Sequence, residues 1–223
     1  STTLRLVLGL DSPTAGTADI NGHPYRDLRT PLRVVGALLD GRAVHPGRSA
    51  YHHLLFLAQA NGLPRRRVDD VLEQVGLTDV AGRRTKTYSL GMGQRLGIAA
   101  ALLGEPRVLV LDEPVNGLDT EGIRWLRNLL RGLAADGCTV LLSSHLMAEM
   151  ELTADHLVVI AGGRLLADTD MRSFIAANSQ AYVTVRAAES ERLGEVLRDA
   201  GAEVRPGPGG HWRVLGLKAP TIG

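Results

Sequence analysis

An apolar run that ends in two adjacent carboxylates constrains this chain more than any other feature. The residues Val108 to Leu111 are typical of a short parallel strand that is buried on both faces. Asp112 and Glu113 follow, and then Pro114, which cannot continue a strand ladder. In an open parallel sheet, ligands bind beyond the carboxyl ends of the strands. The run therefore predicts either a site for nucleotide hydrolysis, with one carboxylate on a metal and the other on a water, or a solvated acidic turn.

A second segment, residues 85–106, predicts a helix whose start can bind an anion. Gly91 and Gly93 precede a helical apolar run, Leu96 to Leu103, and Ser89 adds a hydroxyl group. Free amides at a helix start attract anions, and glycine lets a ligand approach the backbone closely. We interpret the segment as a phosphate-binding helix terminus, with a capped amphipathic helix as the alternative.

The length of that helix predicts that its start and the acidic pair lie apart. A helix from Met92 to Leu103 would be about 18 Å long, and residues 104–106 then turn into the strand that ends at Asp112. We expect the phosphate-binding start to lie far from the acidic pair of the same chain. Two copies facing head to tail would bring the two features to one phosphate.

The strand pattern recurs after a further helix. Thr120 is a candidate cap for an amphipathic helix that ends at Gly137. A second apolar strand, Thr139 to Leu142, then leads into two serines and His145, and a histidine at this place can contact a phosphate or a water. The alternation of helices and strands over residues 92–152 predicts a doubly wound α/β sheet.

Shorter elements are predicted in the rest of the chain. They are a helix over Thr2 to Leu10, a strand over Leu32 to Leu39 that ends in Asp40, helices over Ala50 to Ala60 (capped by Ser49) and from Pro64 to Gly76, a hairpin from Asp155 to Ala167 with its turn at Gly162 and Gly163, a helix over residues 171–178, and a β-α-β unit over residues 181–217 with a loop at Pro206 to Gly210.

Composition excludes several classes of protein. The chain has 25 basic and 24 acidic residues, a net charge of +1, and this balance gives no footprint for nucleic acid. The single cysteine, Cys138, rules out an internal disulfide. The longest apolar stretches fall short of the roughly 20 residues that span a bilayer, so a role at a membrane requires a partner.

Taken together, these motifs resemble those of an ATP-binding cassette ATPase over residues 1 to about 175. VLVLDEP resembles the Walker B strand, NGLD the D-loop and SSH the switch-histidine loop, while STTLRLVLGL is similar to the end of the Walker A loop and its helix. YSLGMGQR resembles the signature motif LSGGQ, with Leu90 and Met92 in place of a glycine and the glutamine. The finer resemblance is to ATPases of drug- and antibiotic-resistance exporters of the daunorubicin and bacitracin types.

The resemblance implies a role for each matching residue around ATP and Mg²⁺. Ser1 would ligate the magnesium, and Thr2 would reach a phosphate. Asp112 would hold the magnesium through water. Glu113 would orient and deprotonate the attacking water, and His145 would contact the γ-phosphate.

A second set of residues matches the parts of the family that surround the nucleotide. Ser89 and Gly91, with Met92 at the last signature position, would close on ATP held by the other protomer. Asp119 would couple the two sites. Asp40 stands where the family usually has the Q-loop glutamine, and its carboxylate could bind the magnesium or its water.

The resemblance also implies partners and a location. Such subunits dock on a separate membrane permease at the cytoplasmic face of the membrane and pair as homodimers, and they drive export of a drug, an antibiotic or another hydrophobic compound. No nucleic-acid partner is expected. The alternatives are a soluble cassette ATPase without a transport role, or a catalytically inert, truncated cassette.

The family has strands, an adenine-stacking aromatic, and the P-loop glycines and lysine before the position of Ser1. We therefore expect a fragment that binds ATP weakly, because each lost charge-assisted hydrogen bond is worth roughly 1.5–3 kcal/mol. The expected fold is α/β: a P-loop NTPase-type sheet flanked by helices over residues 1–175, with a helical signature subdomain at about 45–104. Residues 180–223 would form a small α+β appendage, also incomplete.

Overall fold

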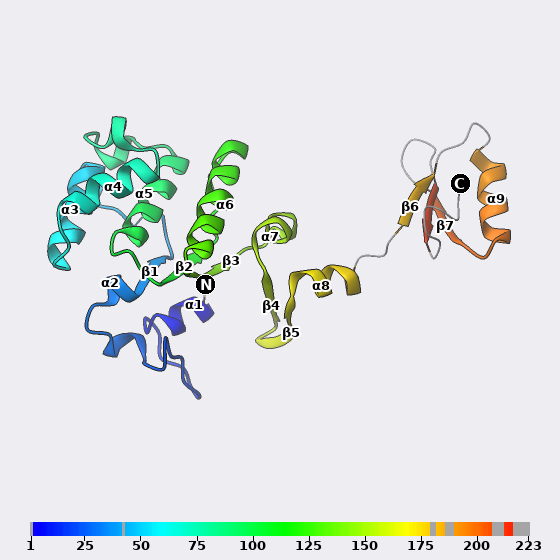
Figure 1. Cartoon of the computed structure of the whole chain (residues 1–223), viewed down its shortest axis with the longest axis horizontal. Helices are drawn as coiled ribbons and strands as arrows, with labels where there is room; N and C mark the ends of the chain where they lie inside the picture. The colour runs from blue at the N-terminus through cyan, green and yellow to red at the C-terminus, as the bar shows by residue number, and fades with distance from the viewer. Residues whose placement is uncertain (1, 42, 179–181, 186–189, 207–211, 216–223) are drawn as a thin grey trace. The chain divides into compact units, whose positions relative to one another are not determined.

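The protein divides into two compact units, residues 1–153 and 154–223 (Figure 1). In this computed structural model the described residues are 2–41, 43–178, 182–185, 190–206 and 212–215. The division falls before the predicted hairpin at 155–167, whereas the sequence placed the boundary between residues 175 and 180. Within the described ranges, no helix has both the length and the apolar character needed to cross a bilayer.

A three-stranded parallel sheet forms the centre of the first unit, which confirms the predicted α/β class. Its strands are β1 (Val35–Leu38), β2 (Val108–Asp112) and β3 (Thr139–Ser143), in the order β1-β2-β3. In the register of the sheet, Leu111 lies beside Leu38 on one side and Leu142 on the other. The strand that carries the acidic pair is therefore the central one.

The predicted strand over Leu32 to Leu39 is wrong at its beginning. Residues Pro31–Val34 form a short helix, α2, and the strand starts only at Val35. Pro31 explains the difference, because the fixed φ of proline and its missing N–H suit the first position of a helix.

Side chains that alternate along the strands divide the core into two layers. On one face, Leu38, Leu109 and Leu111 belong to a large buried cluster, which we call the major core. On the other face, Val35 and Val110 join a smaller cluster, the minor core, whose other buried members are Leu4, Leu8 and Ile20. Helix α1 (Thr2–Val7) supplies the first of these leucines, so it covers the face opposite the larger helical layer.

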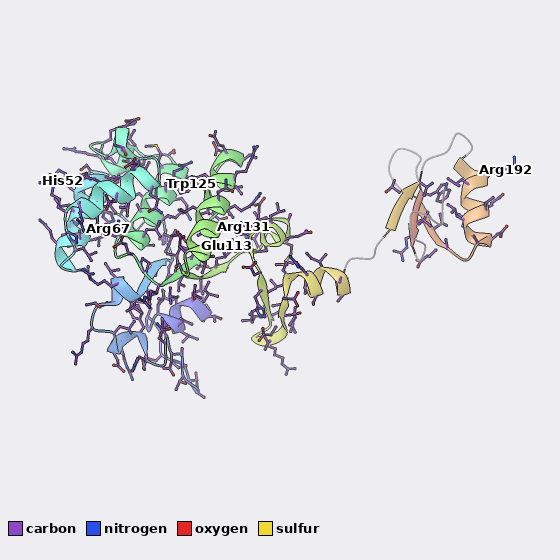
Figure 2. The ribbon with its side chains drawn as sticks, in the orientation of Figure 1. His52, Arg67, Glu113, Trp125, Arg131 and Arg192 are labelled. Atoms are coloured by element: carbon purple, nitrogen blue, oxygen red, sulfur yellow. The ribbon has the colours of Figure 1, made fainter. Side chains whose placement is uncertain are left out.

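Four helices contribute buried side chains to the major core: α3 (Ala50–Ala60), α4 (Arg66–Gln74), α5 (Leu90–Leu102) and α6 (Thr120–Ala135). Helix α7 (Met147–Thr153) and three 3-10 turns, Tyr25–Asp27, Thr78–Val80 and Thr85–Thr87, complete the unit. Arg95 of α5 donates to the carbonyl of Val75 at 2.9 Å and lies 4.2 Å from the ring centre of Trp125 (Figure 2). It thereby links α5 to the end of α4 and to α6.

Caps fix the starts of these helices. Ser49 accepts the N–H of His52 at 3.2 Å and confirms the predicted start of α3. The prediction that Thr120 caps α6 is wrong, because Asp119 occupies the cap and its carboxylate accepts the N–H of Gly122 at 2.7 Å.

Helix α5 lies directly on β1 because glycine occupies the contact. A Cβ added at Gly36 would lie 2.0 Å from the carbonyl oxygen of Ala101. No side chain fits in that space, so this glycine sets the distance between helix and sheet. The position of the start of α5 over the sheet depends on it.

The second unit contains a hairpin and a small sheet. Strands β4 (His156–Ala161) and β5 (Arg164–Asp170) pair antiparallel around Gly162 and Gly163, as predicted, and α8 (Met171–Asn178) follows. The remaining elements are β6 (Tyr182–Val185), α9 (Ser190–Asp199), β7 (Glu203–Pro206) and β8 (Trp212–Leu215), and their sheet has the order β6-β8-β7 with antiparallel neighbours.

The predicted β-α-β unit therefore lacked one strand, β7. Pro206 ends that strand, although the sequence placed it in a loop, and the rest of that loop lies outside the described residues. A four-residue strand with one apolar residue in the core, Val204, has too short a pattern to be seen in the sequence.

Candidate functional site

The acidic pair lies where the central strand ends. β2 carries Asp112 as its last residue, and Glu113 follows with a φ of 47°. This left-handed conformation costs a residue other than glycine on the order of 1–3 kcal/mol, so it persists only where the surroundings hold it. Strain of this kind concentrates at functional sites.

Ser143 holds both residues of the pair. Its hydroxyl group donates to Oδ1 of Asp112 at 2.5 Å and accepts the backbone N–H of Glu113 at 3.0 Å. The contact follows from the register, in which Asp112 of β2 lies beside Ser143 of β3. Sequence reasoning gave Ser143 no role; its signal was a hydroxyl group at the end of a parallel strand.

His145 lies beside the second carboxylate of the pair. Its Nδ1 is 2.8 Å from Oε2 of Glu113. An ionised carboxylate only accepts hydrogen bonds, so the imidazole donates here. The side chains of His145 and Glu113 are 65% and 29% exposed, so this half-open pair can reach a ligand from solvent. Glu113 is labelled in Figure 2.

The start of α5 packs against the turn that follows the acidic pair. Ser89 caps the helix by accepting the N–H of Met92 at 3.2 Å, and the Met92 side chain packs on the major core. A Cβ added at Gly91 would lie 3.0 Å from the carbonyl oxygen of Gly117, and one added at Gly117 would lie 2.3 Å from Cγ of Leu90. Close contact at both positions requires glycine.

The expected separation between the start of α5 and the acidic pair is wrong. Nε2 of Gln94, in the first turns of the helix, donates to the carbonyl of Pro114 at 3.0 Å. The strand β2 runs back along the helix that precedes it, so the chain returns to where α5 begins. The separation therefore gives no argument for a second copy.

The other predicted site residues lie in different surroundings. The carbonyl of Asp40 accepts the N–H of Ala43 at 3.1 Å, and Asp119 caps α6. Thr2 is the exposed first residue of α1, and Ser1 lies outside the described residues. Across the described ranges, no group of three or more His, Cys, Asp or Glu side chains could hold a metal ion.

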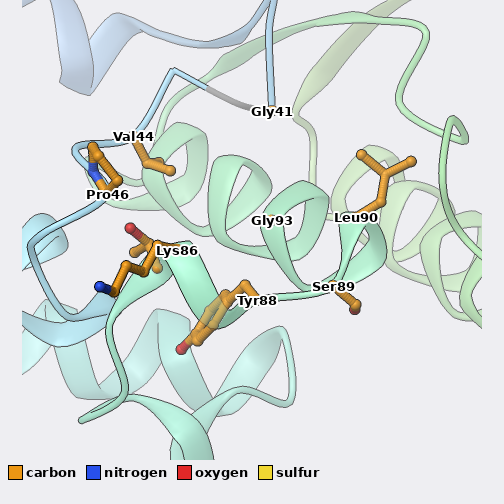
Figure 3. A pocket seen from close by; sticks show the side chains of 9 residues that line it. Gly41, Val44, Pro46, Lys86, Tyr88, Ser89, Leu90 and Gly93 are labelled. Carbon is orange, nitrogen blue, oxygen red and sulfur yellow. The ribbon is translucent and has the colours of Figure 1, made fainter.

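A cavity of about 370 Å³ lies between the segment after Asp40 and the start of α5. Figure 3 shows Ser89 and Leu90 where α5 begins and Lys86 and Tyr88 on the segment that leads to it. The hydroxyl group of Tyr88 donates to the carbonyl of Val80 at 2.8 Å, and burial raises its pKa. The lining residues are Gly41, Val44, Pro46, Thr85, Lys86, Tyr88, Ser89, Leu90 and Gly93.

Two family models match the chain. The model described as "ABC transporter" matches residues 1–116, and one described as "Domain of unknown function (DUF8746)" matches residues 181–223. A solved structure titled "Structure of ATP binding subunit of ABC transporter" superposes with a TM-score of 0.70 at 28% sequence identity, covering 79% of this chain and 75% of that one.

Curated relatives show the same similarity. The bacitracin transport ATP-binding protein BcrA of Bacillus licheniformis is 40% identical over 169 residues, which is 74% of this chain and 55% of the relative. The lantibiotic transport ATP-binding protein SrtF of Streptococcus pyogenes is 34% identical over 170 residues, 76% of this chain and 73% of the relative. The chain thus spans 55% of the length of BcrA.

Proposed function

Because this chain belongs to the ABC transporter family, we propose that it is the nucleotide-binding subunit of an exporter that hydrolyses ATP to move an antibiotic or another drug-like compound. The observation that carries this proposal is the contact network of Asp112, Glu113, Ser143 and His145 at the ends of β2 and β3. Similarity to transport ATP-binding proteins for bacitracin and lantibiotics supports the class of substrate.

The network supplies what phosphoryl transfer to water needs. Glu113 takes the proton of the attacking water, and its carboxylate is oriented by the Ser143 contact on its own N–H and by His145. His145 contacts the terminal phosphate from the exposed side of the pair. Ser143 fixes the orientation of the neighbouring Asp112 carboxylate.

The donor atoms also suit magnesium. Mg²⁺ prefers oxygen ligands and is bound through one or two carboxylates together with waters and substrate phosphates, so an all-protein cage is not needed. Asp112 would hold it, with Ser1 as a direct ligand and Asp40 on the metal or its water, while Thr2 reaches a phosphate. Bound MgATP supplies the phosphoryl group and neutralises the charge that develops on it.

The parts around the nucleotide come from a second copy in this proposal. Ser89, Gly91 and Met92 at the start of α5 close on ATP held by the partner protomer, and Asp119 couples the two sites. The free amides of α5 and its capping serine support an anion-binding role. Leu90 gives this helix start a half-exposed apolar side chain, where the family motif has glycine.

A separate membrane permease at the cytoplasmic face is the proposed docking partner, and no nucleic-acid partner is proposed. The ATP-binding cassette would span residues 1–175, with its helical subdomain at about 45–104. Residues 180–223 would form an appended domain, and the second family match covers 181–223.

The test is Glu113→Gln in the full chain. The variant keeps the shape of the side chain and removes its basicity, so ATP turnover should fall by about 10²–10⁴-fold while binding of a fluorescent ATP analogue persists. Glu121→Gln, on an exposed carboxylate of the first turn of α6, is the matched control and should keep full turnover. Unchanged turnover in Glu113→Gln removes the base role, and absence of ATP binding by the natural chain rejects the function.

A further inference from the structure

Gln94 is a polar side chain buried inside an otherwise apolar helix. It is 7% exposed and lies among the buried leucine, isoleucine and alanine residues of α5. Its Nε2 donates to the carbonyl of Pro114 at 3.0 Å. Pro114 follows Glu113 directly, so this hydrogen bond joins α5 to the strained turn of the acidic pair.

The opposite side of the same amide is covered by the residue after Asp40. A Cβ added at Gly41 would lie 2.3 Å from Oε1 of Gln94 and 3.4 Å from its Cα. Cβ atoms added at Gly93 and Gly97 would lie 3.6 Å and 3.5 Å from the backbone of Gly41. The segment after β1 therefore rests on α5 at the position of this amide.

Three segments thus meet at one buried side chain: the end of β1, the turn after β2, and the start of α5. We propose that Gln94 is a positioning residue, which holds the turn of Glu113 in a fixed relation to Ser89 and to the segment of Asp40. The inference rests on the proposed function, and Gln94 acts through Pro114 without touching the nucleotide.

The chemistry of the amide explains why glutamine is suited to this place. A buried donor that loses its acceptor keeps its full desolvation cost, so the Pro114 contact is retained once the side chain is enclosed. Methionine has a similar length but no N–H to donate. Asparagine keeps the amide, but its side chain is one methylene shorter. Either substitution releases the carbonyl of Pro114 and with it the turn.

The experiment compares Gln94→Met and Gln94→Asn with Thr85→Val. Thr85 is a fair control because it is also buried, at 6% exposure, and its hydroxyl donates to a backbone carbonyl, that of His45, at 2.9 Å. A displacement of about 1 Å at a reacting group can cost about a hundredfold in rate. We expect kcat to fall by about ten- to a hundredfold in both Gln94 variants, with KM for ATP unchanged. Thr85→Val should keep the natural kcat.

A second readout needs no nucleotide. Hydrogen–deuterium exchange should become faster over residues 113–119 in the Gln94 variants, because the amides of Asn116 and Leu118 bond within this turn, to the carbonyls of Glu113 and Val115. Thr85→Val should leave exchange there unchanged. Two variants of different size are used so that a folding failure of one leaves the other to decide.

The outcomes separate the two proposals. If Glu113→Gln loses turnover and the Gln94 variants do not, the positioning role is overturned and the proposed function stands. An equal fall of kcat in Thr85→Val would reduce Gln94 to a general packing role and overturn the inference. If the natural protein has no turnover, the proposed function fails, and exchange over residues 113–119 alone decides whether Gln94 holds the turn.

Discussion

His145 presents Nδ1 to Oε2 of Glu113 at 2.8 Å, across the ends of two neighbouring parallel strands. The two residues are far apart in the sequence, and each lies just beyond its own strand, β2 or β3. Parallel strands bring their carboxyl ends to one edge, which is why a carboxylate and an imidazole meet there. Both side chains remain open to solvent on the side away from the sheet.

Replacing His145 with alanine should lower ATP turnover by about a hundredfold, because a donor aimed at developing charge is lost. The free energy of unfolding should change by no more than about 1 kcal/mol, since the pair is largely exposed. His156→Ala is the matched control: His156 forms a similar contact with Asp168 in the second unit, at 2.5 Å. Steady-state ATPase assays check the prediction, and equal losses in both variants would contradict it.

Replacing Ser143 with alanine should destabilise the first unit by about 1–3 kcal/mol, because the N–H of Glu113 loses its acceptor in a half-buried place. Ser144→Ala is the neighbouring control. Its hydroxyl accepts only the exposed N–H of Leu146 at 3.1 Å among the contacts of the described chain, so the cost should be smaller. Urea unfolding measures both, and an equal shift of the two midpoints would argue against the bridging role of Ser143.

Gly36→Ala should lower the stability by about 1–3 kcal/mol, because the new methyl group meets the backbone of Ala101 and forces α5 away from β1. Gly132→Ala lies in the interior of α6, where a Cβ would meet no atom within 4 Å. It should stabilise the protein by about 0.5–1 kcal/mol, since alanine loses less entropy in a helix than glycine. Thermal melts followed by circular dichroism should show shifts of opposite sign.

The buried imidazole of His53 predicts a loss of stability in mild acid. Burial lowers its pKa, the positive charge of Arg48 lowers it further, and its Nδ1 has no partner. Because the pKa is lower in the folded than in the unfolded state, the stabilisation is complete above about pH 6.5 and is lost as the pH falls through the folded-state value. The slope is at most about 1.4 kcal/mol per pH unit for one proton.

His53→Leu should therefore flatten the decline of the unfolding free energy between about pH 7 and pH 5. His23→Gln, at an exposed histidine of the first unit, should leave the decline unchanged. Urea titrations at a series of pH values measure the slope. The same decline in His53→Leu as in the natural chain would exclude this histidine as its source.

Patterns along the sequence predicted elements better than they predicted contacts. The central strand, β3, α3 and the glycine turn of the hairpin follow from apolar periodicity and caps, which are local properties. The helix at Pro31 and the strand β7 were missed because each is only four residues long. Elements of that length carry too few side chains to show a period.

The site was predicted residue by residue but not as an arrangement. Glu113 and His145 were chosen because each follows a strand, and parallel pairing brings them together. Ser143 and Gln94 were given no role, since a serine at a strand end and a glutamine in a helix are common. The one signal for Gln94 was a polar residue at the head of an apolar helical run, and its partner, Pro114, lies twenty residues away.

The two layers on the parallel sheet are held unequally, and this has a kinetic consequence. The minor core under α1 is a thin layer, whereas the major core joins four helices to the other face. Regions with less buried apolar surface open at lower free energy than the rest of the molecule. We therefore expect α1 to peel from Val35 and Val110 in partial unfolding events that leave β2 paired, so that Thr2 is released long before Asp112.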